Sequence, residues 1–201
     1  MTVVWRRPVT YLAVIVAVLV VWILLTATGA VKPILLASPV DVWARLVFLA
    51  KTPIAIFQPI AVTLGEVGVA FVIAAVLAIP VGVITGSSEL LRQAYTPLLT
   101  TLNALPLVIL YPVLAATLGI GSESKVALGA LYGFFPIAIA TAQAAAQVDR
   151  RLLIASEVMG ASRGQRIQSV TLPAIAGPIV SGMRVSLALT LVTIIAGEFI
   201  S

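Results

Sequence analysis

Side chains that could carry out chemistry are few in this sequence, and they do not cluster. The 201 residues include no cysteine and no histidine, which excludes disulfide bonds, thiolate nucleophiles, imidazole acid–base catalysis and Cys/His metal sites. Seven carboxylates remain, spread along the chain. The sequence also lacks the Gly-x-x-x-x-Gly-Lys-Ser/Thr loop that cradles nucleotide phosphates. We therefore expect no catalytic residue, no metal site and no cofactor bound by this chain.

One polar segment, residues 147–172, stands out between two apolar stretches. Its spacing predicts a short helix, a glycine turn, a second short helix and a proline stop. Gly160 suits the turn because a left-handed conformation is needed there, and Pro173 cannot donate a helical hydrogen bond. One side of the first helix would hold Leu152, Leu153, Ser156 and Met159, and one side of the second Ile167 and Val170. A solvated linker without a partner is the alternative that the pattern leaves open.

Two long apolar stretches contain residues, most of them with polar side chains, that could line a polar path between helices. They are Thr100, Thr101, Asn103, Pro106, Arg184, Ser186, Thr190 and Thr193, of which Asn103, Pro106, Arg184 and Thr190 are the favoured set. Hydrogen bonding between helices, worth around 0.6 kcal/mol per bond, is the more common role of such groups. Arg184 would cost roughly 2.5–3.5 kcal/mol at the bilayer centre, so we expect it to act as an anchor nearer the cytoplasm.

The composition places most of the chain in a membrane. Hydrophobic residues make up 61% of it and charged residues 9%, whereas a soluble domain carries about 25% charged residues. So few charges cannot coat a water-facing surface, so the remaining surface must face lipid. The net charge is +5, but the basic residues lie mostly between apolar stretches, which favours a role in membrane orientation over nucleic-acid binding.

The apolar stretches predict an all-α polytopic membrane bundle that forms one domain over residues 1–201. Five spans are expected, at about 9–29, 60–85, 95–118, 126–146 and 173–199. Prolines at 97, 106 and 112 should bend the third span. Gly129 and Gly133 in the fourth are typical of close helix packing. Residues 31–59 predict a short amphipathic helix at the membrane surface.

The distribution of Lys and Arg predicts the orientation of these spans. A cytoplasmic N-terminus places Arg6, Arg7, Arg92, Arg150, Arg151, Arg163 and Arg166 inside, and Lys32, Arg45, Lys51 and Lys125 outside. The opposite orientation would place the larger group outside. Residues 147–172 should therefore form a cytoplasmic loop.

This loop resembles the "EAA" loop of binding-protein-dependent ABC importer permeases. Gly160 and Leu172-Pro173 match the spacing of that loop. The residues that resemble the subfamily for nitrate, sulfonate and taurine are Asp149, Arg151, Leu152, Leu153, Gly160, Ala161, Ser162 and Arg163. Further similar motifs follow in order along the chain: Leu36-Ala37-Ser38-Pro39, Val42-Trp43, Ile79-Pro80-Val81-Gly82, Leu105-Pro106, Gly119-Ile120-Gly121, Phe134-Phe135-Pro136 and Gly182-Met183-Arg184.

The sequence departs from the family pattern at three places. Ile154 stands where the family loop opens with an acidic residue, and Glu157 follows about one turn later. Glu66 stands where a basic residue is common. After Glu198 the family usually continues with a glycine-containing loop and a sixth span, so this chain resembles a permease that lacks the last span and should end on the outer side.

The resemblance implies a type I importer fold and a division of labour between subunits. The chain would be the permease of an ATP-driven importer in the bacterial inner membrane, paired with a second permease copy, most simply a homodimer. An ABC ATPase dimer would use the ATP, and an external solute-binding protein would deliver the solute. The implied coupling residues are Leu152, Leu153, Ser156, Glu157, Met159, Gly160, Ala161 and Ser162.

Two other functions are compatible with a polytopic membrane chain. An ion-coupled secondary transporter would need carboxylates near the bilayer midplane. However, Glu66 and Glu198 lie near span ends, where gating or structural contacts are expected rather than proton relays. ATP-dependent uptake that survives an uncoupler would separate the two. A non-transporting scaffold would not co-purify with an ATPase. The solute stays open among sulfonates, nitrate, taurine, bicarbonate and vitamin-like compounds.

Overall fold

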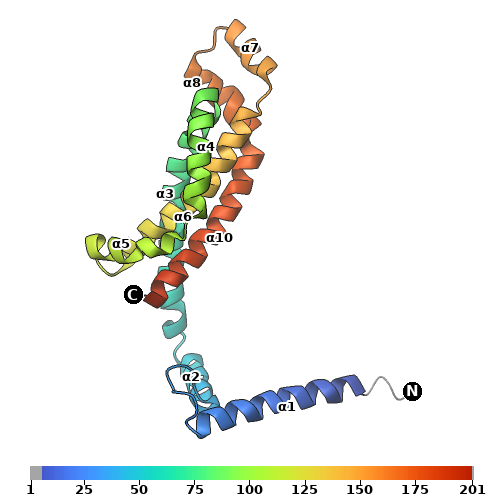
Figure 1. Ribbon diagram of the computed structural model, residues 1–201, viewed down its shortest axis with the longest axis vertical. Helices are drawn as coiled ribbons and strands as arrows, with labels where there is room; N and C mark the ends of the chain where they lie inside the picture. Colours follow the sequence, from blue (N-terminus) through green and yellow to red (C-terminus); the bar gives the residue numbers. More distant parts are fainter. Residues whose placement is uncertain (1–5, 201) are drawn as a thin grey trace. The chain divides into compact units, whose positions relative to one another are not determined.

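The computed structural model describes residues 6–200, and these are almost entirely helical (Figure 1). The elements are α1 (Arg6–Ala27), α2 (Pro39–Lys51), α3 (Ile54–Gly86), α4 (Glu89–Ala104), the 3-10 turn η1 (Leu107–Leu110), α5 (Tyr111–Leu118), α6 (Ser122–Ala146), α7 (Arg150–Val158), α8 (Arg163–Arg166), the π turn η2 (Ile167–Thr171), α9 (Leu172–Ala174) and α10 (Ala176–Ile200). No strand occurs within the described range. The predicted all-α fold class is confirmed.

The chain divides into two compact units, one up to Ile60 and one from Ala61. In the first unit, the segment between α1 and α2 is held by a hydrogen bond of 2.9 Å from Nε1 of Trp22 to the carbonyl oxygen of Ala37. Ser38 caps α2, because its Oγ accepts from the backbone N–H of Asp41 at 3.1 Å. The expected amphipathic segment therefore contains one capped helix. The single domain over residues 1–201 stays a prediction.

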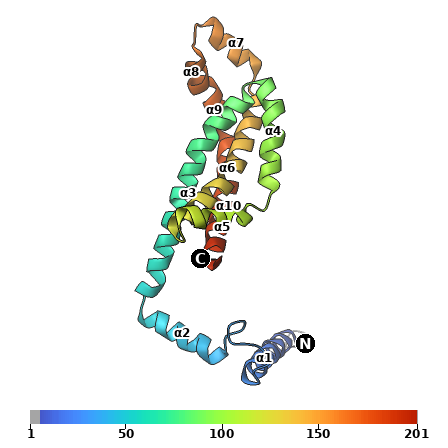
Figure 2. The same ribbon diagram turned by 60° about the vertical axis from the view of Figure 1, so that its left-hand side comes forward.

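The core of the second unit is built on small side chains that let helices approach closely. Figures 1 and 2 both show α3, α4, α6 and α10 running side by side. Ala70, Ala74 and Ala78 recur every fourth residue on α3 and are essentially inaccessible to solvent. A Cβ added at Gly133 of α6 would lie 2.5 Å from Oγ1 of Thr190 on α10. The close helix packing that was expected at Gly133, because glycine has no side chain, is thus confirmed.

Four described helices are long and apolar enough to cross a membrane, namely α1, α3, α6 and α10. A fifth candidate is the pair formed by α4 and the stretch from η1 to α5, which bends by 79° at Leu105-Pro106. Pro97 lies inside α4 and Pro112 in the first turn of α5, where proline is tolerated. The expected third span, 95–118, is therefore interrupted, and Pro106 alone of its three prolines coincides with the break.

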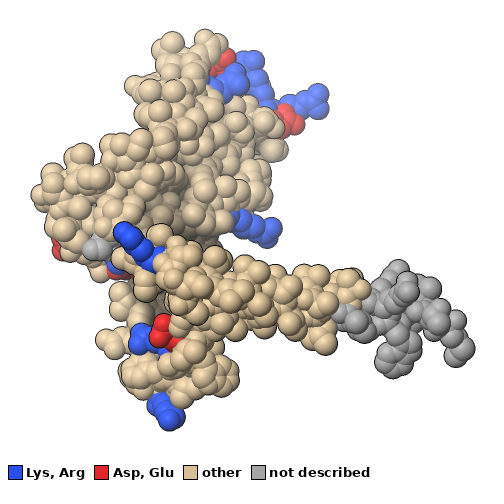
Figure 3. Space-filling model, turned by 60° about the horizontal axis from the view of Figure 1, so that its bottom comes forward, with Lys and Arg blue, Asp and Glu red and all other residues tan. Residues whose placement is uncertain are grey.

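The surface of the chain carries long uncharged areas, as the composition predicts. On the face drawn in Figure 3, charged side chains gather in a few small groups, with broad areas of other residues between them. Large aliphatic side chains are exposed along α1, α3 and α10, among them Leu12, Val72 and Val185. Such faces are stable only against lipid or another apolar surface. The chain is accordingly a multi-pass membrane protein.

The connection from the polar segment into α10 differs in detail from the expected helix with a proline stop. Helical structure continues from α8 through η2 and α9, with Pro173 in the first turn of α9. In η2 the N–H of Leu172 donates to the carbonyl oxygen of Ile167, one residue further back than in an α-helix. This longer register accommodates Pro173, which has no N–H to donate.

Candidate functional site

The predicted glycine turn after the first short helix is present and closes by two backbone hydrogen bonds. Gly160 has φ of +82°, in the left-handed region. The N–H of Gly160 donates to the carbonyl oxygen of Glu157 at 2.9 Å, and the N–H of Ala161 donates to that of Ser156 at 3.0 Å. This pair of bonds is the Schellman arrangement that satisfies the last carbonyl groups of a helix. The end of α7 is therefore a defined structure rather than a slack linker.

Both helices of this segment, the α7–α8 loop (residues 149–166), begin at a side-chain cap. Oδ1 of Asp149 accepts from the backbone N–H of Arg151 at 2.8 Å, which caps α7. Ser162 and Gln165 form a capping box at α8, in which the Gln165 side chain accepts from the N–H of Ser162 at 2.8 Å. The Ser-x-x-Gln spacing was a readable signal for this start, and sequence reasoning missed it.

An ion pair ties the two helices of the α7–α8 loop together. Nη1 of Arg166 lies 3.0 Å from Oε2 of Glu157. Sequence reasoning placed Glu157 among the coupling residues and did not foresee this contact. Because the Glu157 side chain is 69% exposed, the energy of the pair is on the order of 1 kcal/mol or less. Its effect is to fix how α8 folds back beside α7.

The apolar end of α7 projects away from the rest of the second unit. Val158 and Met159 are 82% and 86% exposed. Of the predicted coupling residues, Leu152, Glu157, Met159, Gly160 and Ser162 are exposed, Leu153 and Ala161 are half-buried, and Ser156 is buried. Ser156 donates to the carbonyl oxygen of Leu153 at 2.7 Å. The outward surface thus includes Val158, which the spacing argument overlooked, and leaves Ser156 on the inner side.

The α7–α8 loop lies at one end of the second unit, and the end of α10 lies at the other (Figures 1 and 2). Ile167 and Leu172 pack against a cluster formed by Val83 of α3, Ala145 of α6 and Ile179 of α10. The loop is therefore anchored on three long helices.

The predicted path residues lie on several elements and differ in burial. Thr190 is fully buried and donates to the carbonyl oxygen of Gly129 at 3.2 Å, which is a helix-to-helix contact. Asn103 is half-buried near the end of α4, Pro106 is exposed at the break that follows, and Arg184 is exposed on α10. Their role in translocation stays a prediction.

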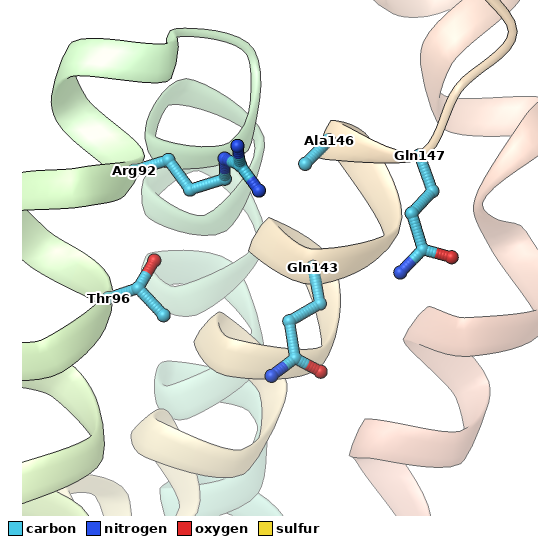
Figure 4. Close-up of a pocket in the computed structure, with 5 residues that line it drawn as sticks. All are labelled: Arg92, Thr96, Gln143, Ala146 and Gln147. Atoms are coloured by element: carbon cyan, nitrogen blue, oxygen red, sulfur yellow. The ribbon is translucent and has the colours of Figure 1, made fainter.

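A cleft of about 290 Å³ opens between α4 and α6 near the end that carries the α7–α8 loop. Figure 4 shows Arg92 and Thr96 of α4 facing Gln143 and Ala146 of α6, with Gln147 at its rim. Arg92 forms an ion pair with Glu89 at the start of the same helix. Within residues 6–200 no group of three Asp or Glu side chains is placed to hold a metal ion.

Glu66 and Glu198 meet at the other end of the unit, far apart in sequence. Both carboxylates approach Lys125, whose Nζ lies 2.9 Å from Oε1 of Glu66 and 3.9 Å from Oε1 of Glu198. The two carboxylates come from α3 and α10, and the lysine from the first turn of α6. Gating or structural contacts were expected of both carboxylates, and the structure shows that both of them pair with Lys125.

Comparison with known proteins gives matches along nearly the whole chain. Residues 78–201 match the family described as binding-protein-dependent transport system inner membrane component. A probable ABC transporter permease protein of Brucella melitensis biotype 1 is 34% identical over 180 residues, covering 90% of this chain and 72% of that protein. The taurine transport system permease protein of Escherichia coli K12 is 27% identical, covering 98% and 75%. The nitrate import permease protein of Synechocystis sp. is 29% identical, covering 96% and 71%.

Proposed function

Because this chain belongs to the family of binding-protein-dependent transport system inner membrane components, as the permease subunit of an ABC importer, we propose that the α7–α8 loop couples it to a separate ATPase. The observation that carries this proposal is the exposed apolar end of α7 at Val158 and Met159, held by the turn at Gly160. Apolar side chains that project from a polar loop gain free energy when a partner covers them.

An ATPase dimer is the partner that this surface best fits. The chain carries no phosphate-binding loop of its own, so ATP must be hydrolysed elsewhere. The α7–α8 loop is firmly capped and anchored on α3, α6 and α10 through Ile167 and Leu172. A rigid anchored loop transmits displacement, whereas a slack one would absorb it. Closure of the ATPases around ATP would thereby move the long helices.

We expect Met159→Glu to weaken co-purification of the ATPase subunit with this chain by about tenfold or more. The substitution would bury a carboxylate in an apolar contact, and losses of about 2 kcal/mol are common at such central positions. Gln168→Glu is the matched control, because it adds the same charge at an exposed position of η2 beyond the turn. Co-purification unaffected by Met159→Glu, measured on tagged complexes in detergent, would count against the docking surface.

The proposed orientation places the N-terminus and the α7–α8 loop in the cytoplasm of a bacterial cell, with the chain in the inner membrane. The excess of Arg and Lys on that side supports this orientation. Because the chain contains no cysteine, single cysteines can report it directly. In intact spheroplasts, a membrane-impermeant maleimide should label Ile120→Cys, near the start of α6, and should label Met159→Cys only after lysis. Both residues are highly exposed. The reverse pattern would invert the topology.

The proposed cargo is a small solute delivered by an external binding protein and moved through a pair of permease chains, most simply a homodimer. Relatives named for taurine and nitrate support a sulfonate, nitrate, taurine or similar compound as the solute, with vitamin-like compounds as further candidates.

A further inference from the structure

Three helices of the second unit are joined by charge at the end opposite the α7–α8 loop. Lys125, at the start of α6, reaches Glu66 of α3 and Glu198 of α10. Oγ1 of Thr63, one turn before Glu66 on α3, donates to Oε1 of Glu198 at 2.6 Å. We refer to Thr63, Glu66, Lys125 and Glu198 as the charge cluster. None of these contacts lies near the α7–α8 loop, so the proposed coupling role does not explain the charge cluster.

The ion pair between Lys125 and Glu66 is short and buried. Their separation is 2.9 Å, and their side chains are only 11% and 5% exposed. Breaking such a pair would leave a charge buried without compensation, which is strongly unfavourable. Glu66 therefore fixes the position of the lysine on the shared surface of α3 and α6.

The contact between Lys125 and Glu198 is of a different kind. Its atoms are 3.9 Å apart, and the Glu198 side chain is 34% exposed. A long, partly hydrated ion pair can separate and re-form at low cost. Gly197 allows the approach, because a Cβ added there would lie 3.2 Å from Cγ of Lys125. Because Oε1 of Glu198 also accepts from Thr63 at 2.6 Å, Glu198 can leave the lysine while it stays bound to α3 and without disrupting the buried pair.

Helix α10 connects the contact between Lys125 and Glu198 with the α7–α8 loop. It contains 25 residues and is thus about 37 Å long. Close to its start, Ile179 packs with Ile167 of η2 and Leu172 of α9, which directly follow the α7–α8 loop. At its far end, Glu198 meets the charge cluster. A displacement imposed on the loop would reach Glu198 through a continuous helix.

We propose that Lys125 and Glu198 are positioning residues of the transport cycle. Lys125, fixed by Glu66, holds the outer end of α10 through Glu198, and transport requires this contact to open and close. The inference rests on the proposed coupling role of the α7–α8 loop for its drive, but the contact itself can be tested without that role.

The test uses one reporter cysteine, Thr193→Cys, in the otherwise cysteine-free chain expressed together with its ATPase subunit. Thr193 is buried on α10 about one turn before Glu198, so a water-soluble maleimide should label the cysteine slowly while the helix is held. We expect Glu198→Gln to raise the labelling rate about threefold, as the loss of a partly exposed ion pair allows. Glu123→Gln is the matched control, since it removes an exposed carboxylate from the same turn of α6.

Two measurements separate positioning from a merely structural role. Glu198→Gln should leave the thermal midpoint close to that of the parent chain, whereas Glu66→Gln should lower it. Trapping the ATPase with ATP and vanadate should change labelling in the parent chain but not in Glu198→Gln. Unchanged labelling in Glu198→Gln, or a rise matched by a lower midpoint, would overturn the inference. Loss of ATPase binding in the parent chain would instead remove the proposed coupling role and leave the labelling comparison intact.

Discussion

Gly160→Val should reduce solute uptake by about tenfold or more while ATP hydrolysis continues. Gly160 has φ of +82°, a conformation that a β-branched residue adopts only under strain. Such strain costs on the order of 1–3 kcal/mol, and about 1.4 kcal/mol corresponds to a factor of ten in an equilibrium. The turn would re-form in another geometry, and the exposed end of α7 would no longer meet the ATPase correctly. Uptake and ATP hydrolysis measured in proteoliposomes with binding protein would report the uncoupling.

Two variants isolate the backbone conformation as the cause. No atom lies within 4 Å of a Cβ built at Gly160, so a steric clash cannot explain a defect there. Gly160→Asn should retain most uptake, because asparagine tolerates the left-handed region. Gly164→Val should also retain it, since Gly164 has equally open surroundings and no positive φ. Normal uptake by Gly160→Val, or an equal loss in Gly164→Val, would refute the role of the turn.

The turn at Gly160 was predictable because its signals are local. A glycine after a short amphipathic run, followed by a second run and a proline, encodes a helix end through backbone conformation alone. The outward face of α7 was not predictable in the same way. Apolar side chains lie on several sides of this nine-residue helix, so its spacing does not decide whether Ser156 or Val158 points outward. The tertiary structure, in which Ser156 is buried and Val158 is 82% exposed, decides it.

The break in the expected third span shows a similar limit. Three prolines predicted a bend, but the sequence does not indicate at which of them the helix breaks. Helix α4 continues through Pro97, since neighbouring residues supply the remaining helical bonds, while Leu105 adopts extended backbone before Pro106.

The charge cluster could be predicted even less from the sequence. Glu66, Lys125 and Glu198 were each visible in it. Their meeting depends on how α3, α6 and α10 pack, which no local pattern contains.

Gly86→Ala should destabilise the chain more than a methyl group added at Gly82 or Gly68. A Cβ at Gly86 would lie 2.2 Å from the backbone oxygen of Ala142, and one at Gly82 would lie 2.5 Å from Cβ of Thr141. A backbone oxygen cannot rotate away as a side chain can, so α3 and α6 would have to separate. Overpacking of this kind costs about 1–3 kcal/mol, against a gain of up to about 1 kcal/mol in helix propensity.

Gly68→Ala on the same helix is the control for this cost. No atom lies within 4 Å of a Cβ built there, so only the propensity gain should remain. Thermal unfolding in detergent should therefore give a lower midpoint for Gly86→Ala than for the parent chain, and an equal or higher one for Gly68→Ala. Adding Gly82→Ala to Gly86→Ala should cost less than the sum of the two, because one separation of α3 from α6 relieves both clashes. Equal midpoints for Gly86→Ala and Gly68→Ala would show that the two helices do not approach at Gly86.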